Sequence, residues 1–198
     1  IYNGVDLNIS SAKLLPHRMD GIPQNKFIIG TTSRFIFWKR VDYLIKAFYQ
    51  FQKGKDDAIL LLVGDGPDMT MLKELVKELD IIDKVIFAGY KKNVQNYQSI
   101  MDVCVFPSKT ETFGLVAIEC LNLGKPVLVF NDGGGITELV EMIEPNNICD
   151  SIKQMVEKLN QYHSFELSIE NMEKRKRFAE KFSITICSEN FENLYKSL

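Results

Sequence analysis

Short apolar segments alternate with amphipathic segments along this chain, and this alternation is the strongest constraint on its fold. Every residue of Ala58–Val63 is apolar, which predicts a strand buried on both faces of a sheet. Elsewhere apolar residues recur at helical spacing, as at Val41, Leu44 and Ile45. The predicted strands are residues 26–32, 58–63, 84–89, 103–106 and 126–130. Because no hairpin signal joins them, we expect an α/β fold with a doubly wound, mostly parallel sheet and helices on both faces.

The length and the net charge of the chain limit the kinds of protein that it can be. Its 198 residues suffice for one domain with a sizeable core. A net charge of −2 gives no indication of nucleic-acid binding. The longest apolar run, Ala58–Val63, is too short to cross a bilayer. The chain starts with Ile1 rather than methionine, so we expect it to be a fragment of a longer protein.

Cysteine and histidine residues give no sign of a disulfide or a metal site. No Cys-x-x-Cys pair occurs among the four cysteines, which favours reduced thiols in the core of a cytosolic protein. The two histidines, His17 and His163, are far apart and lack the spacing of metal ligands. We expect both at the surface.

Two glutamates, Glu111 and Glu119, lie in residues 107–119, where a predicted strand is followed by a loop and then by a helix. The apolar run Val103–Phe106 predicts a buried strand before Glu111, and the helical spacing that follows places Glu119 about one turn inside a helix. Gly114 lies where that helix begins, so backbone N–H groups there can bind an anion at close approach. A sugar nucleotide suits such a site, with its diphosphate on the N–H groups and its hydroxyls on the carboxylates.

Two basic residues, Arg34 and Lys39, flank the predicted loop between the first strand and the first helix. An α/β sheet binds ligands at the carboxyl ends of its strands, so two cations there can bind an anion. Solvated side chains in an exposed loop are the alternative. The next such loop contains Gly64 and Gly66, but the third glycine of a dinucleotide-binding motif is replaced by Met69. A tight turn is therefore favoured there.

The stretch Pro107-Ser-Lys-Thr-Glu-Thr-Phe-Gly-Leu115, followed by Glu119, resembles the Glu-x7-Glu segment of retaining glycosyltransferases of family 4. Further motifs occur in the family's order: Asn3-Gly-Val-Asp6, Arg34 with Lys39, Gly64-Asp-Gly-Pro67 and Gly134-Gly-Ile-Thr-Glu138. The chain departs from the family at Ser33, where glycine is usual, at Thr137, where proline is usual, and in a shorter loop before Asn146.

The resemblance implies a Rossmann-like sheet that forms one half of the two-domain GT-B fold. Residues 1–198 would be a single donor nucleotide-sugar-binding domain that begins at the interdomain hinge near Asn3. Residues 184–198 would form a crossover helix toward the missing amino-terminal, acceptor-binding domain. Leu194, Tyr195 and Leu198 would then be partly exposed in this fragment.

The resemblance also implies roles for individual residues. Arg34 and Lys39 would bind the diphosphate and Glu111 the transferred sugar, and we expect these three residues to be catalytic. Glu119 would bind both ribose hydroxyls. The segment 90–92 would face the nucleobase, although an exposed loop with solvated lysines is an equal alternative. The whole predicted donor site consists of Arg34, Lys39, Tyr90, Lys91, Lys92, Glu111, Thr112, Phe113, Gly114, Leu115, Val116 and Glu119.

The implied reaction is transfer of a sugar, expected to be a hexose, from a UDP- or GDP-linked donor to a saccharide or lipid-linked acceptor, with retention of anomeric configuration. No metal ion or other cofactor is expected, because no Asp-x-Asp pair occurs and Arg34 and Lys39 can replace a metal. We expect a cytoplasmic protein of polysaccharide biosynthesis at the inner face of the membrane, and an isolated fragment that is inactive. A GT-B-like sugar-nucleotide epimerase and a non-catalytic scaffold are the alternatives.

A basic cluster, Lys174-Arg-Lys-Arg177, allows two interpretations. It could dock on an anionic membrane. Because Glu170, Glu173 and Glu180 lie among the basic residues, a solvated helix face is favoured.

Overall fold

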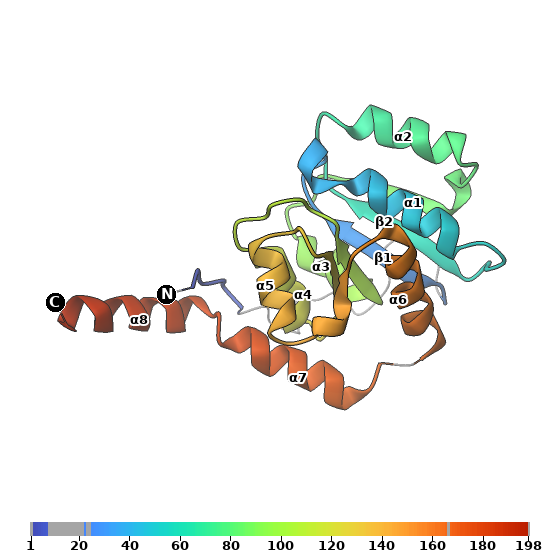
Figure 1. The fold of residues 1–198 in the computed structure, drawn as a ribbon. Helices are drawn as coiled ribbons and strands as arrows, with labels where there is room; N and C mark the ends of the chain where they lie inside the picture. The colour runs from blue at the N-terminus through green and yellow to red at the C-terminus, as the bar shows by residue number, and fades with distance from the viewer. Residues whose placement is uncertain (1, 8–21, 23–24, 166, 198) are drawn as a thin grey trace.

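The computed structural model describes residues 2–7, 22, 25–165 and 167–197, in which six strands form one parallel sheet (Figure 1). The strand order is β3-β2-β1-β4-β5-β6. The strands are β1 (Phe27–Thr32), β2 (Ala58–Val63), β3 (Val85–Gly89), β4 (Val103–Phe106), β5 (Val127–Phe130) and β6 (Ile148–Cys149). The structure thus confirms the predicted doubly wound, parallel α/β architecture.

Helices cover both faces of this sheet (Figure 1). The α-helices of the described residues are α1 (Val41–Phe51), α2 (Met69–Glu78), α3 (Val94–Ile100), α4 (Leu115–Asn122), α5 (Gly135–Glu141), α6 (Ile152–Ser164), α7 (Ile169–Glu180) and α8 (Ile184–Ser197). Helices α1, α2 and α6 pack on one face, and α3, α4, α5 and α7 pack on the other. Successive strand residues therefore enter different cores: Ile28 belongs to one and Ile29 to the other, both fully buried. This double burial is why the strands read as continuous apolar runs.

The five predicted strands are all present, with ends shifted by at most one residue, and the helix predicted at residues 184–198 is α8. Three elements escape prediction. Helix α3 is short and mostly polar, α5 begins at a glycine, and β6 has two residues, so none shows a clear hydrophobic period. The four cysteines are free thiols, and Cys104, Cys120 and Cys149 are buried, as expected from their apolar surroundings.

His163 differs from the expectation of a surface residue. Its side chain is half-buried, with Nε2 2.9 Å from Asp57 Oδ2 and the ring packed edge-on against Phe27 at a centroid distance of 5.1 Å. His17 lies outside the described residues, as does most of the polar segment 7–25, which contains Pro16 and Pro23 and whose sequence indicates a loop.

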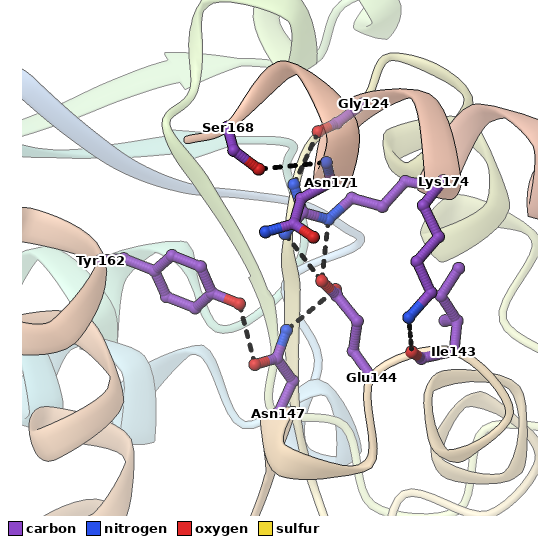
Figure 2. A network of polar contacts seen from close by, with 9 residues as sticks. Gly124, Ile143, Glu144, Asn147, Tyr162, Ser168, Asn171 and Lys174 are labelled. Atoms are coloured by element: carbon purple, nitrogen blue, oxygen red, sulfur yellow. Dashed lines mark hydrogen bonds and ion pairs between the residues drawn. The ribbon is translucent and has the colours of Figure 1, made fainter. Parts of the chain in front are cut away.

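Arg175 fixes α7 to the body of the domain through hydrogen bonds to Glu144 and Gly124, which belong to the polar network that Figure 2 shows. Its side chain is 2% exposed, and it donates to Glu144 Oε1 at 2.9 and 2.6 Å and to the carbonyl of Gly124 at 3.1 Å. Asn147 donates to the other oxygen of Glu144 at 3.0 Å, and the hydroxyl of Tyr162 donates to Asn147 at 2.9 Å. The expected solvated basic face is therefore wrong for Arg175, because the helical period turns this residue inward.

The beginning of the chain packs against the start of α8 (Figure 1). The backbone N–H of Val5 donates to Phe182 at 2.9 Å, and that of Ile184 donates to Val5 at 2.8 Å. A Cβ atom at Gly4 would lie 2.7 Å from the Cα atom of Ile184. The sequence pair Asn3-Gly4 is typical of a simple turn. This prediction is wrong, because neither residue forms a turn, and the glycine instead permits close packing.

Helix α8 projects away from the sheet (Figure 1). Leu194 and Tyr195 on this helix are exposed, as expected, and Leu198 lies outside the described residues. In the parts of the chain that the structure describes, no helix combines the length and the apolar character needed to cross a membrane.

Candidate functional site

Two adjoining cavities lie at the carboxyl end of the sheet, where the strand order reverses between β1 and β4. The first measures about 280 Å³ and the second about 400 Å³. Both are lined by Thr32, Ser33, Arg34 and Val116. The first is also lined by Asn3, Thr31, Lys39, Phe106, Pro107, Ser108, Glu111, Thr112, Phe113, Gly114 and Leu115. Ligands of doubly wound sheets bind at such reversal points, so the fold places these residues where a ligand is expected.

The loop after β1 places Arg34 between the two cavities. Backbone hydrogen bonds hold this loop against the one after β2: Ser33 N–H donates to Val63 at 3.0 Å, and Phe35 N–H donates to Asp65 at 2.9 Å. The side chain of Arg34 is exposed, so its guanidinium can meet a ligand in either cavity.

The pair Gly64 and Gly66 permits this contact between the loops. A Cβ atom at Gly64 would lie 1.8 Å from the carbonyl oxygen of Ser33, and one at Gly66 would lie 2.2 Å from that of Phe35. The backbone at Gly64 also has a φ of 144°, which favours glycine. The two glycines therefore serve tight packing, which supports the turn interpretation.

Lys39 and Glu111 form an ion pair inside the first cavity. Their side chains are about one-fifth exposed, at 20% and 21%. The 3-10 helix Phe37–Lys39 carries the lysine, and its Trp38 carbonyl accepts a hydrogen bond of 2.7 Å from the backbone N–H of Lys109. The loop after β1 is thus joined directly to the loop after β4.

A glycine-rich loop after β5 holds the backbone of Glu111. Glu111 N–H donates to Gly133 at 2.6 Å, and Gly135 N–H donates back to Glu111 at 2.8 Å. A Cβ atom at Gly135 would lie 2.3 Å from the carbonyl oxygen of Thr112. Larger residues would therefore separate the two loops, so these glycines have a structural role.

The amino terminus of α4 faces the first cavity. Its cap, Gly114, has a φ of 89°, and a Cβ atom there would lie 2.6 Å from the side chain of Ile136. The N–H groups of the first helical turn have no partner within the helix, and two residues of this turn, Leu115 and Val116, line the cavity. These N–H groups and the helix dipole favour an anion.

Glu119 lies on α4 one turn beyond Val116 and lines neither cavity. Its carboxylate Oε2 accepts a hydrogen bond of 3.1 Å from Gln98 Nε2, and the same nitrogen donates to Thr32 Oγ1 at 3.0 Å. Burial raises the pKa of Glu119, and the hydrogen bond from Gln98 opposes this shift. Glu119 is thus tied through Gln98 to Thr32, which lines both cavities.

The structure places only two of the three residues predicted to face a nucleobase at a cavity. Tyr90 and Lys91 line the second cavity beside Val63 and Val94, and Tyr90 is 77% exposed. Lys92 is exposed and lines neither cavity, so its part in the site stays a prediction.

Sequence reasoning missed several residues of this site. Asn3 lines the first cavity, and Gln98 is fully buried on a helix that was not predicted. Within the described residues, three buried side-chain atoms lack a hydrogen-bond partner: Thr31 Oγ1, Ser33 Oγ and Gln98 Oε1. All three belong to residues at or beside the cavities, and such unpaired groups often mark a functional site. Ser33 had a signal in the sequence, since it replaces the glycine that is usual in the family.

Comparison with known proteins gives the following matches. A sequence model of the family described as glycosyl transferases group 1 matches residues 16–182. An uncharacterized glycosyltransferase of Haemophilus influenzae is 32% identical over 184 residues, which cover 91% of this chain and 52% of that protein. The N-acetyl-alpha-D-glucosaminyl L-malate synthase of Bacillus anthracis is 35% identical over 130 residues, 66% of this chain and 34% of that protein. The chain spans about half the length of several curated relatives that it matches.

Solved structures share the fold. HepE of Anabaena, crystallised in complex with UDP, has a TM-score of 0.85 and 23% sequence identity, covering 100% of this chain and 57% of that one. A glycosyltransferase of Rickettsia africae has a TM-score of 0.79 and 22% identity, covering 98% of this chain and 55% of that one. These matches agree with the predicted GT-B, Rossmann-like architecture.

Proposed function

This chain belongs to the family of glycosyl transferases group 1, and on that premise we propose that it is the donor-binding half of a retaining glycosyltransferase. Its ligand would be a sugar linked to a nucleoside diphosphate, bound across the two cavities. The observation that carries this proposal is the convergence of Arg34, Lys39, Glu111 and the amino terminus of α4 on the first cavity.

The first cavity suits the diphosphate and the transferred sugar. Arg34 and Lys39 would neutralise the phosphates, and the N–H groups at the start of α4 would bind their oxygens. These groups also stabilise the negative charge that develops on the departing nucleoside diphosphate. Glu111, which pairs with Lys39 in this structure, would instead accept hydrogen bonds from hydroxyls of the sugar when the lysine turns to phosphate.

The second cavity suits the nucleoside. It is bordered by Val63, Val94 and Val116, with Tyr90 and Lys91 at its edge, which offers an apolar surface for a base. Glu119 would bind the two ribose hydroxyls near the junction of the cavities. The UDP in the HepE crystals and in other solved structures that share this fold supports a nucleotide ligand. We propose UDP or GDP as the nucleoside diphosphate of the donor.

The acceptor half would come from the remainder of a longer enzyme, since the chain spans 52–55% of several curated relatives. We propose a saccharide or lipid-linked acceptor, a hexose as the transferred sugar, a cytoplasmic location at the inner membrane face, and an inactive isolated domain. Arg34 and Lys39 would make a divalent metal unnecessary. Activity that persists in excess EDTA would support this point, and loss restored by a divalent ion would contradict it.

The decisive test is calorimetric titration of the full-length protein with UDP, GDP and ADP, repeated with Arg34→Ala. We expect one nucleotide to bind and the substitution to weaken it about tenfold or more, because a hydrogen-bonded charge pair is lost. Lys53→Ala is the matched control, since Lys53 is exposed in the turn that follows α1 and lines neither cavity.

The outcomes separate the alternatives. Failure of all three nucleotides to bind would contradict donor binding and favour a scaffold. Nucleotide binding followed by formation of an epimerised sugar nucleotide, without transfer, would favour an epimerase.

A further inference from the structure

We propose that Gln98 is a positioning residue that holds the carboxylate of Glu119 in the orientation required to bind the ribose of the nucleotide. This inference rests on the proposed function. It concerns a buried residue that lines neither cavity and that no motif of the sequence identified.

The contacts of Gln98 place it between the end of β1 and Glu119. Its side chain is fully buried, and its single amide nitrogen donates to Thr32 Oγ1 at 3.0 Å and to Glu119 Oε2 at 3.1 Å. Thr32 ends β1 and lines both cavities, whereas Glu119 lies on α4. Gln98 therefore joins the end of the central strand to the helix that carries the carboxylate.

The chemistry of the partners fixes the orientation of the amide. A carboxylate only accepts hydrogen bonds, so the Nε2 atom must face Glu119, and the reversed amide would place two oxygens against each other. Both N–H bonds of Gln98 are then used, and its Oε1 atom is left without a partner. The two oxygens of Glu119 are no longer equivalent, because one is held by Gln98 and the other stays available.

A role in stability alone explains this arrangement poorly. An unpaired buried acceptor destabilises the folded state, and an apolar residue of similar length would avoid that cost. What only an amide supplies here is a donor that keeps the half-buried carboxylate oriented and favours its charged form. An acceptor for two ribose hydroxyls needs both properties.

The test compares Gln98→Met with wild type in the full-length protein, using the nucleotide that binds best among UDP, GDP and ADP and its 2′-deoxy counterpart. In wild type we expect the deoxy nucleotide to bind roughly tenfold more weakly, because a hydrogen bond to a charged group is lost. In Gln98→Met we expect the natural nucleotide to bind more weakly and the deoxy nucleotide to keep its affinity. The ratio of the two affinities should then fall to about threefold or less. Gln95→Met is the matched control, because Gln95 lies on the same helix and lines neither cavity.

A second comparison tests whether Gln98 acts through Glu119. Glu119→Ala alone should abolish the discrimination, and adding Gln98→Met to it should change the ratio no further. Circular dichroism and thermal unfolding establish whether each variant is folded. If Gln98→Met does not fold, Gln98→Glu keeps the size of the residue but replaces its N–H donors with a second carboxylate beside Glu119, and the same loss of discrimination is expected.

The outcomes distinguish this inference from the proposed function. If nucleotide binds and Arg34→Ala weakens it, but a folded Gln98 variant keeps the wild-type ratio or weakens both nucleotides equally, the positioning role is overturned and the donor site stands. If no nucleotide binds the wild-type protein, both the positioning role of Gln98 and the proposed donor site are contradicted.

Discussion

The side-chain ammonium of Lys39 contacts the carboxylate of Glu111, although the two residues are 72 positions apart in the chain. The two residues come from loops that follow β1 and β4, the strands between which the sheet reverses its order. Without a ligand, the cation and the carboxylate neutralise each other. A phosphate that binds Lys39 must therefore replace Glu111 as its partner.

Replacing Glu111 with glutamine should separate binding from turnover. Because Lys39 loses a competing carboxylate, we expect the affinity for nucleoside diphosphate to rise about 1.5- to 5-fold, the range given by a partly exposed ion pair of about 0.2–1 kcal/mol. Turnover should fall, because the sugar loses an acceptor. Titration calorimetry and a transfer assay measure the two effects, and Lys39→Met, which should lower both, is the counterpart. Weaker nucleotide binding in Glu111→Gln would contradict this account.

Glu119 should make nucleotide binding sensitive to acid at a higher pH than an ordinary glutamate would. Burial raises its pKa above the usual 4.5, so its carboxyl takes up a proton before most others as the pH falls. The protonated group accepts fewer hydrogen bonds, and affinity should decline. Titrations between about pH 7 and 4 should show this decline in wild type and a smaller one in Glu119→Gln, which cannot ionise. Identical pH curves for the two proteins would show that protonation of Glu119 does not cause the loss of affinity.

The same carboxyl should cost stability at neutral pH. Because its folded pKa lies above its unfolded pKa, the unfolded state binds fewer protons between the two values, and stability falls as pH rises through that window. The loss is complete above the folded pKa. Urea unfolding at pH 7 should therefore show that Glu119→Gln is more stable than wild type, while it binds nucleotide more weakly. A variant that loses both stability and affinity would indicate a structural role for the carboxylate.

Arg175 should be far more important for stability than its exposed neighbour in the basic cluster. Removing it leaves Glu144 half-buried without its cation, so we expect Arg175→Ala to lower the free energy of unfolding by about 3–5 kcal/mol. Arg177→Ala, on the same helix but exposed, should change it by no more than about 0.5 kcal/mol. Urea denaturation measures both. Equal effects would show that α7 is not held by the network in Figure 2.

The left-handed backbone of Arg40 should lower the stability of the protein, and this effect can be measured separately from that of the side chain. This residue precedes α1 with φ 47° and ψ 40°, a left-handed conformation that disfavours side chains by about 1–2 kcal/mol. Arg40→Ala and Arg40→Gly both remove the ion pair with Asp132, so their difference reports the backbone alone. We expect the glycine variant to be more stable by about 1 kcal/mol after the greater freedom of its unfolded chain is counted. Thermal unfolding of the two variants decides the point.

The sequence predicts those parts of the protein that rest on local pattern. Continuous apolar runs such as Ala58–Val63 indicate strands buried on both faces, and helical spacing after Arg40 indicates α1. Most candidate site residues follow from motifs at strand ends, and Arg34, Lys39 and Glu111 do line one cavity. Helix α3 escapes prediction because it is short and mostly polar, and Gln98 escapes with it.

The amino-acid sequence by itself thus determined the order of strands and helices, the parallel sheet, and the side chains available at its carboxyl edge, because these depend on hydrophobic period and on short motifs. Only the tertiary structure decided which of those side chains meet. It paired Lys39 with Glu111, tied Glu119 to Thr32 through Gln98, and turned Arg175 inward toward Glu144. Contacts of this kind join residues from distant elements, and packing of the whole domain sets their distances, so no local pattern encodes them.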